Sequence, residues 1–433
     1  MNWLLFILLL CLGILSFFFN RRCILTPSFV MTGVMMLSAL LLALNTDYWD
    51  YRISIETLVI ILMSVLAFWV GETIALHSKR VIIVGRASYL DDRQLIKLSS
   101  WKYYLLIVVS FILFGIFFYF QYINASSVGM AGSISSLVSA NRWYVENRVG
   151  GEIEKFLFIC HRVLVYLMIF YYFYNKICFN LRGKKILTIL IALPYFLSCA
   201  ISSNRSDIIS FASFLIFIII FLNYRKINWE SSNNGKLILS LVAIGALALY
   251  AFRMLGYLTG KSLLSSTYDN ISLYAGSPFL SFDMYISGKA QGFDSNSHPL
   301  LFRGIYSIIN MFGFNIDAHS FFKPHQHWGR WGANVYSSLL EYHIKFGTLG
   351  LLVMEVMIGM FYGCIWKKIK SGVASWPLVI IYGELFFYYI CMYPIDERLF
   401  SQFFTLTSFI EVFLIIVFVN KLFDLKKGED HEL

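Results

Sequence analysis

Residues 3–19 read WLLFILLLCLGILSFFF, an uncharged apolar run that is long enough, as a helix, to cross the hydrocarbon core of a bilayer. Runs of this kind recur along a chain that is 58% hydrophobic, 18% aromatic and only 14% charged. Soluble globular domains do not have this composition. The sequence therefore predicts an all-α, polytopic integral membrane protein with about eleven transmembrane helices. They are expected at Trp3–Phe19, Pro27–Leu44, Ile55–Leu76, Tyr103–Tyr122, Phe156–Tyr174, Ile186–Ile201, Asp207–Asn223, Leu237–Phe252, Phe346–Ile365, Trp376–Tyr393 and Phe400–Val419.

Basic residues are distributed unequally between the two sides of the predicted membrane. Arg21 and Arg22 follow the first apolar run, and short basic segments follow every odd-numbered helix, where they hold most of the 35 Lys and Arg residues. Because short cytoplasmic loops are enriched in positive charge, this pattern predicts an outer N-terminus and a cytoplasmic C-terminus. The net charge of +10 then reflects topology rather than nucleic-acid binding. The first run has no basic segment before it and is expected to remain as a helix rather than to be cleaved as a signal peptide.

The organisation that this topology predicts is a single membrane domain over residues 1–433 with two long outer loops. The large loop covers residues 253–345, and the smaller one covers residues 121–155. None of the seven cysteines lies in either loop, so neither disulfides nor cysteine-bound zinc are expected to hold the loops together. An aqueous loop as large as residues 253–345 is expected to serve chemistry or recognition.

The outer side of the predicted topology is rich in arginine, whereas the cytoplasmic side is rich in lysine. Arginine offers a planar fork that binds phosphate or carboxylate groups through two parallel hydrogen bonds. Four arginines are expected at or just below the outer membrane surface, namely Arg162, Arg205, Arg253 and Arg398. Their common depth favours a shared anionic ligand such as a lipid-linked diphosphate. The alternative is that each one reaches the outer headgroups or neutralises a nearby acid such as Asp207, Asp396 or Glu397.

Polar side chains of the two outer loops are candidates for substrate binding. In the smaller loop, Arg142 lies within a run of amide, aromatic and charged residues. This mixture suits sugar binding, in which rings stack and amides bond to hydroxyls, and it equally suits a helix lying on the membrane surface. Arg303 and Arg330 of the large loop belong to the same excess of outer arginines and are further candidates.

Five of the eight histidines lie in the large loop, and His319, His325 and His327 are close together in sequence. No carboxylate or cysteine stands at metal-ligand spacing beside them, and Pro324 indicates a turn. The sequence therefore predicts neither a metal site nor a cofactor, and a role for a divalent metal is left open.

Glu355, Glu384 and Glu411 lie near the middle of the last three predicted helices. Carboxyl groups at this depth mark polar cavities, ion pathways or bonds between helices. They favour either a proton-coupled transporter or acids that are hydrogen-bonded across a helix interface, and the sequence does not separate the two.

Two short segments carry a family resemblance. Residues 334–350 read NVYSSLLEYHIKFGTLG, and residues 202–206 read SSNRS. The first resembles the end of the large periplasmic loop of Wzy-type O-antigen and oligosaccharide repeat-unit polymerases, which show Asn-x-Tyr, a further Tyr and then Phe-Gly-x-x-Gly. The second resembles the Arg-Ser motif between two helices of those proteins. Lys345 is a departure, because the family often has an acidic residue before the Phe-Gly pair.

The resemblance implies a GT-C-like glycosyltransferase of the bacterial inner membrane, with residues 253–345 as its large periplasmic loop. It would transfer a growing chain from undecaprenyl diphosphate to the next undecaprenyl-diphosphate-linked oligosaccharide repeat unit. A repeat-unit flippase and a chain-length regulator would be its partners. The alternatives are a lipid-linked oligosaccharide flippase or proton-coupled transporter, which the three glutamates favour, and an O-antigen ligase, which shares the substrate chemistry.

In the polymerase hypothesis, Arg205 and Arg253 neutralise the diphosphate leaving group, and Arg162 and Arg398 assist in binding it. A general base must activate the acceptor hydroxyl. The candidates for the base are Glu341 and His343, and Asn334 and Tyr336 are expected to bind sugar or to position the loop.

Overall fold

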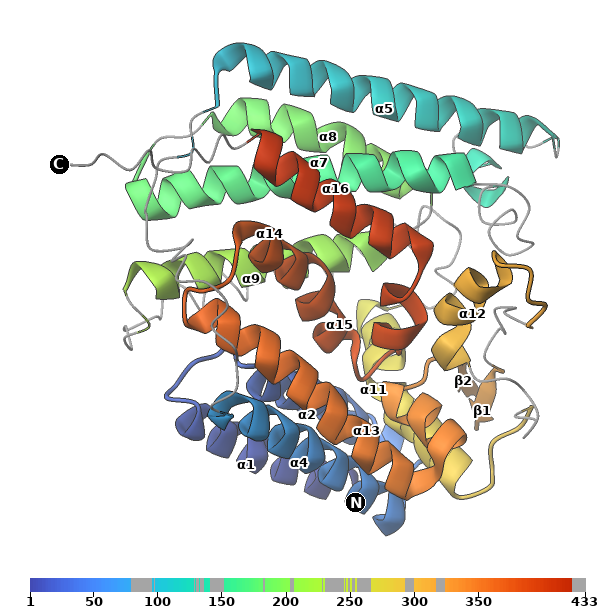
Figure 1. Cartoon of the computed structure of the whole chain (residues 1–433). Helices are drawn as coiled ribbons and strands as arrows, with labels where there is room; N and C mark the ends of the chain where they lie inside the picture. The colour runs from blue at the N-terminus through green and yellow to red at the C-terminus, as the bar shows by residue number, and fades with distance from the viewer. Residues whose placement is uncertain are drawn as a thin grey trace. The chain divides into compact units, whose positions relative to one another are not determined.

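The computed structural model describes residues 1–78, 96, 98–127, 129, 132, 136–140, 152–181, 184–202, 206–227, 229, 245, 247, 250, 254, 266–292, 300–316 and 324–422. The chain divides into two compact units. Unit 1 comprises Met1–Ala87, Leu264–Ala374 and Leu385–Ser408, and unit 2 comprises Ser88–Leu263, Ser375–Glu384 and Phe409–Leu433. Figure 1 labels the elements, and each unit is described by itself.

Seven helices of the described residues are long and apolar enough to cross a membrane. They are α1 (Asn2–Phe19), α2 (Pro27–Leu44), α4 (Ile55–His77), α5 (Ser100–Ser127), α7 (Glu152–Phe179), α9 (Ser206–Lys226) and α13 (Ser338–Lys370). Two further helical stretches are apolar but shorter, namely α8 (Lys185–Ile201) and Trp376–Met392. The structure is therefore mainly helical, as predicted, and its long apolar helices agree with a multi-pass membrane protein. The count of eleven spans, the GT-C-like fold and the orientation stay predictions, and the expected helix at 237–252 lies almost entirely outside the described residues.

In unit 1, α4 and α13 approach each other closely along a stripe of glycines. A Cβ atom on Gly71 of α4 would lie 2.0 Å from the Val356 carbonyl oxygen, and one on Gly359 of α13 would lie 2.1 Å from the Phe68 carbonyl oxygen. Small residues allow the backbones of membrane helices to pack at such short distances. The two helices therefore pack backbone against backbone at these glycines.

The large predicted loop contains a helix that its polar sequence did not reveal. This helix, α11 (Thr267–Ile286), packs against α2, and the Ser38 hydroxyl donates a hydrogen bond to the Ala275 carbonyl. At its other end, Asp283 accepts hydrogen bonds from the Tyr51 hydroxyl at 2.8 Å and from the Ser54 backbone N–H at 2.7 Å. Asp283 thereby satisfies a free donor at the start of α4.

The rest of the described part of the loop forms short elements that also belong to unit 1. They are the 3₁₀ turn η1 (Leu300–Phe302), α12 (Arg303–Asn310) and a hairpin of β1 (Gln326–Trp328) and β2 (Trp331–Ala333), which pair antiparallel. Near the end of α2, the four-residue helix α3 (Thr46–Trp49) supplies two rings to the hairpin. Trp49 lies 5.9 Å from Trp328, and Tyr48 lies 5.0 Å from Trp331, measured between ring centroids.

Helix α13 begins at Ser338, eight residues before the predicted start at Phe346. Gly347 interrupts it with φ 66° and ψ −174°, a conformation that is accessible essentially only to glycine. The residues before Gly347 therefore form a helical segment of their own at the end of the loop.

Unit 2 is built from α5, α7, α8 and α9, with α7 in contact with the other three. Its aromatic core includes Tyr166, which lies 4.6 Å from Phe214, and Phe170, which lies 5.3 Å from Trp376. The later elements of unit 2 are α14 (Trp376–Ile381), the first residues of the π-helix η2 (Tyr382–Phe386) and most of α16 (Leu406–Leu422).

Two π-helices interrupt the last predicted spans. The segment η2 lies between α14 and α15 (Phe387–Met392), and η3 (Leu399–Phe403) precedes α16. A π-turn inserts one extra residue into a helix and is found frequently at functional sites. Glu384 lies in η2, and η3 begins directly after Arg398.

Candidate functional site

The end of the large loop packs against the segment that precedes η3, within unit 1. Ser338, the first residue of α13, donates from its backbone N–H to the Tyr393 carbonyl at 3.0 Å. Its hydroxyl donates to the Tyr393 carbonyl at 2.9 Å and to the Asp396 carbonyl at 3.1 Å. We call the residues gathered at this junction the loop-end cluster: Ser338, Glu341, Tyr342, Glu397 and Arg398.

Glu397 is the central acid of the loop-end cluster. It is 3% exposed and accepts hydrogen bonds from the backbone N–H groups of Phe400 at 2.8 Å and Ser401 at 2.9 Å, and from the Tyr342 hydroxyl at 3.1 Å. Burial raises the pKa of Glu397 to about 7, although the two backbone hydrogen bonds act to lower it. The carboxyl group thus joins the start of η3 to the first turns of α13.

Arg398 provides the cation of this cluster. Its Nε lies 3.5 Å from Asp396 Oδ2, its guanidinium carbon lies 5.1 Å from the centre of the Tyr388 ring, and its side chain is 13% exposed. The expected partner Asp396 is therefore present. Helix α12, which begins at Arg303, packs against η3, and a Cβ on Gly304 would lie 2.5 Å from the Phe404 carbonyl oxygen.

The two candidate bases lie on different sides of α13, as expected for residues two positions apart in a helix. Glu341 is 5% exposed and is close enough to Glu397 to act on its titration. The His343 ring lies 5.9 Å from both Phe282 and Tyr285 of α11, and its Nε2 lies 3.1 Å from the Thr348 hydroxyl. Glu341 thus belongs to the loop-end cluster, and His343 belongs to the face toward α11.

Three further candidates lie around the hairpin. Tyr336 is fully buried, and its hydroxyl donates to the Pro324 carbonyl at 2.5 Å, which favours the positioning role over sugar binding. Asn334 is exposed directly after β2. Arg330 is exposed at the hairpin turn, 5.3 Å from the ring centres of both Tyr48 and Trp331.

Arg162 of unit 2 lies among three acids, Asp207, Glu384 and Glu411. We call these four residues the Arg162 cluster. The Nε and Nη2 atoms of Arg162 donate to the two oxygens of Glu411 at 2.6 and 2.5 Å, and its Nη1 donates to Asp207 at 3.3 Å. Glu384 Oε1 lies 3.6 Å from Nε. The geometry favours the interpretation that Arg162 neutralises acids, and it supports the interhelical hydrogen-bonding interpretation of Glu411.

The third mid-helix glutamate, Glu355, belongs to unit 1 and is fully buried. It accepts a hydrogen bond from the Tyr393 hydroxyl. This contact also agrees with an acid that is bonded across a helix interface.

Arg142, Arg205 and Arg253 lie outside the described residues, as do His298 and His319. His325 and His327 are stacked with ring centroids 5.6 Å apart. Within the described residues, no group of three or more His, Cys, Asp and Glu side chains is placed to hold a metal ion.

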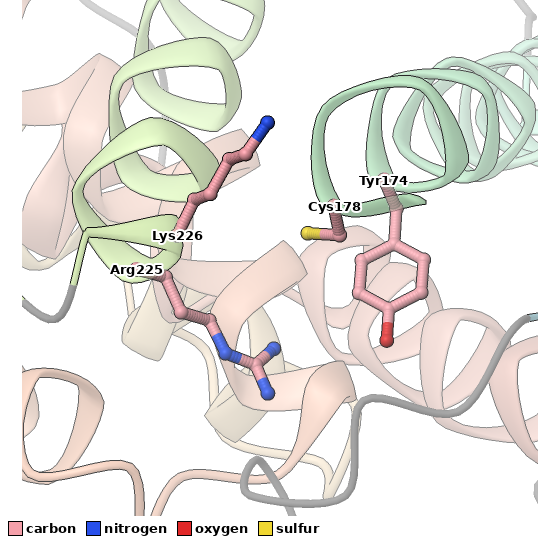
Figure 2. Close-up of a pocket in the computed structure, with 4 residues that line it drawn as sticks. All are labelled: Tyr174, Cys178, Arg225 and Lys226. Carbon is pink, nitrogen blue, oxygen red and sulfur yellow. The ribbon is translucent and has the colours of Figure 1, made fainter. Parts of the chain in front are cut away.

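Figure 2 shows a small hollow in unit 2, with Tyr174 and Cys178 of α7 facing the end of α9 that carries Arg225 and Lys226. Its volume is about 10 Å³, which is room for about one water molecule. A larger groove of about 350 Å³ in unit 1 is lined by Phe19 and by Leu66, Trp69, Val70, Thr73 and Ile74 of α4. The hollow in unit 2 is too small for a sugar diphosphate. The groove in unit 1 is lined mainly by apolar side chains, and among the described residues it contains no charged group that could bind a diphosphate.

The sequence did not predict that Arg162 would pair with Glu384 and Glu411, although each was noted separately. This pairing could have been predicted on physical grounds, because an arginine within an apolar helix requires a counter-charge and acids in the middle of other helices can supply it. Tyr342 and Ser338 lie within the family-like segment 334–350, but the sequence did not predict their hydrogen bonds, because these depend on long-range packing.

Comparisons with models of known protein families, with curated proteins and with solved structures gave no match for this chain.

Proposed function

We propose that the protein is a Wzy-type polymerase, a membrane glycosyltransferase that joins undecaprenyl-diphosphate-linked oligosaccharide repeat units on the outer face of the bacterial inner membrane. The observation that carries the proposal is the loop-end cluster. Residues of the polymerase-like segment 334–350 pack there against the Asp396-Glu397-Arg398 segment, which supplies a partly exposed guanidinium.

The chemistry required is the transfer of a glycosyl group between two carrier-linked molecules. The acceptor hydroxyl attacks the anomeric carbon of the donor, the bond from that carbon to the diphosphate oxygen breaks, and the diphosphate leaves with the electron pair. A base takes the hydroxyl proton. Cations stabilise the charge that grows on the leaving group.

Arg398 is assigned to the diphosphate, with Arg303 at the start of the adjacent helix α12. Glu341 is assigned as the base, with His343 as the second candidate. Arg205 and Arg253 keep their predicted role, which is to neutralise the diphosphate leaving group.

The test is complementation of a strain that lacks the gene. Replacing Arg398 with Ala is expected to reduce polymerisation by about 100- to 1,000-fold, as is typical when one preorganised donor is lost from a transition state. Arg398→Lys retains the charge but not the fork and should recover part of the activity. The measurement is the length distribution of surface polysaccharide at matched expression.

Arg52 provides a matched control, because it is an exposed arginine of the same unit between α3 and α4. Arg52→Ala should give the wild-type distribution. Wild-type chains from Arg398→Ala would remove Arg398 from the mechanism, and failure of the purified protein to lengthen carrier-linked glycans would remove the polymerase proposal itself.

The same deletion strain distinguishes the alternatives. Loss of a polymerase leaves single repeat units attached to the surface glycolipid. Loss of a flippase or transporter leaves none, and loss of a ligase leaves polymer that is made but not attached.

A further inference from the structure

The Arg162 cluster contains more carboxyl groups than its single guanidinium can pair. Arg162 lies on α7, Asp207 in the first turn of α9, Glu384 in η2 and Glu411 on α16, and all four residues belong to unit 2. Glu384 and Glu411 are each 1% exposed. The carboxyl groups of Glu384 and Glu411 are therefore shielded from bulk water.

The donors of Arg162 are already used by two of the acids. The two carboxylate oxygens of Glu411 accept hydrogen bonds from Nε and Nη2 of Arg162, at 2.6 and 2.5 Å. Asp207 accepts a hydrogen bond from Nη1 at 3.3 Å. The 3.6 Å between Glu384 Oε1 and Nε is too long for a hydrogen bond. Neither oxygen of Glu384 has a hydrogen-bond partner in the part of the chain that the structure describes.

The neighbouring elements supply no second cation among the described residues. Helix α7 presents the Tyr166 hydroxyl, which donates to Ser210 of α9 at 3.2 Å, and α8 presents Tyr195 and Cys199. His161 of α7 is engaged elsewhere, with Nε2 2.8 Å from the Ser110 hydroxyl of α5. Two glutamates therefore share one arginine, and only Glu411 is hydrogen-bonded to it.

A proton resolves this imbalance. An ionised carboxylate that is buried without a donor is strongly disfavoured, and a second carboxylate beside it adds repulsion. Glu384 Oε1 and Glu411 Oε1 lie 3.6 and 2.6 Å from the same atom, Arg162 Nε, so the two carboxyl groups are close neighbours. One proton between them would turn that repulsion into a hydrogen bond.

We propose that the Arg162 cluster is a proton-binding site, in which Glu384 and Glu411 hold one proton between them while Glu411 pairs with Arg162. The π-helix η2 places Glu384 toward the cluster, in keeping with the frequent use of such turns at functional sites. Loss of the proton would make Glu384 compete with Glu411 for Arg162, and so would change the contacts among η2, α16 and α7. The site is independent of the polymerase proposal, because it concerns the protonation of unit 2 and not the transfer of sugars.

Infrared spectroscopy of the purified full-length protein in lipid nanodiscs provides the test. Wild-type protein at neutral pH should show the carbonyl-stretch band of a protonated carboxylic acid shielded from solvent. Wild-type minus Glu384→Gln and wild-type minus Glu411→Gln difference spectra should each contain this band. Glu56→Gln, which changes an exposed acid in the first turn of α4, should leave it in place. Absence of a carboxylic-acid band from both difference spectra would overturn the proposal, because the other buried acids of the chain cancel in the subtraction.

Thermal unfolding provides a second measurement that does not depend on band assignment. Glu384→Gln should unfold at the wild-type temperature, because the amide is neutral like the protonated acid and can donate to Glu411. Glu411→Gln should unfold at a lower temperature, because it removes the charged partner of Arg162. Equal losses in the two variants would identify Glu384 as an ionised partner and contradict the proposal.

Sodium distinguishes a proton from a bound metal cation. Replacing choline chloride with sodium chloride at constant ionic strength should not change the unfolding temperature of the wild type. A rise with sodium that is absent from Glu384→Gln would show that a metal cation, not a proton, occupies the site.

Discussion

Glu397 and Glu355 of unit 1 have their own hydrogen-bond donors, whereas Asp207, Glu384 and Glu411 of unit 2 lie around one guanidinium. Glu397 receives two backbone N–H groups and a tyrosine hydroxyl, and Glu355 receives the hydroxyl of Tyr393. In unit 2, Glu384 stands 3.6 Å from a guanidinium that already serves Glu411 and Asp207. The same residue type therefore joins elements in one unit and forms an unbalanced electrostatic site in the other.

The largest effect is expected from removing the cation of unit 2. Arg162→Ala would leave the paired acids buried without their counter-charge, and breaking a buried ion pair in this way costs about 3–5 kcal/mol. Thermal or denaturant unfolding of the purified protein measures the loss. The double variant Arg162→Met, Glu411→Leu should recover much of the stability, because it also removes the carboxylate that accepts two of the hydrogen bonds from Arg162. A double variant no more stable than Arg162→Ala would show that the pairing is not what stabilises unit 2.

A smaller effect is expected from removing one donor in unit 1. Tyr342→Phe takes away one of the three hydrogen bonds to Glu397, and such a loss costs about 1–3 kcal/mol. Tyr119→Phe is the control, because Tyr119 is 60% exposed on α5. Equal unfolding temperatures for both variants and the wild type would mean that Glu397 is held by its backbone donors alone.

The smallest effect is a pH dependence of unit 1. Because the pKa of Glu397 is raised to about 7 from an unfolded value of 4.5, the folded state keeps a proton that the unfolded state has lost. Below pH 4.5, the contribution of Glu397 to the free energy of unfolding is therefore fully present. It decreases as the pH rises from 4.5 to about 7, and it does not change further above that pH. The fall should be at most about 1 kcal/mol between pH 6 and pH 7. Hydrogen exchange at the amides of Phe400 and Ser401, corrected for intrinsic rates, measures it, and Glu397→Gln should abolish the slope.

Apolar runs were sufficient to predict most of the described helices. The prediction of Pro27–Leu44 matches α2 at both ends, and Trp3–Phe19 differs from α1 by one residue. Helix α11 was missed because its serines, asparagine and aspartates lower its hydropathy, although the three serines and Asp283 are buried in the structure. The π-helices have no sequence signal at this level, since one extra residue per turn does not alter composition.

The candidate site was predictable only in part. The sequence named Asp207, Asp396 and Glu397 as acids that the outer arginines could neutralise, but it did not assign any of them to a particular arginine. It could not pair Glu411 with Arg162, since 249 positions separate them and only packing brings them together. The hydrogen bonds of Tyr342 and Ser338 depend on the same long-range packing.

The break at Gly347 determines where the chain enters the bilayer. An unbroken helix of 33 residues would be about 50 Å long, much more than the roughly 30 Å thickness of a hydrocarbon core. The part after Gly347 is about 35 Å long and suffices to span it, so the preceding turns are free to take another direction. Any side chain at position 347 would favour one continuous rod and would carry Glu341, Tyr342 and Ser338 away from the segment they bind. One residue without a side chain thus separates the long apolar part of α13 from the short helical segment that packs against the residues before η3.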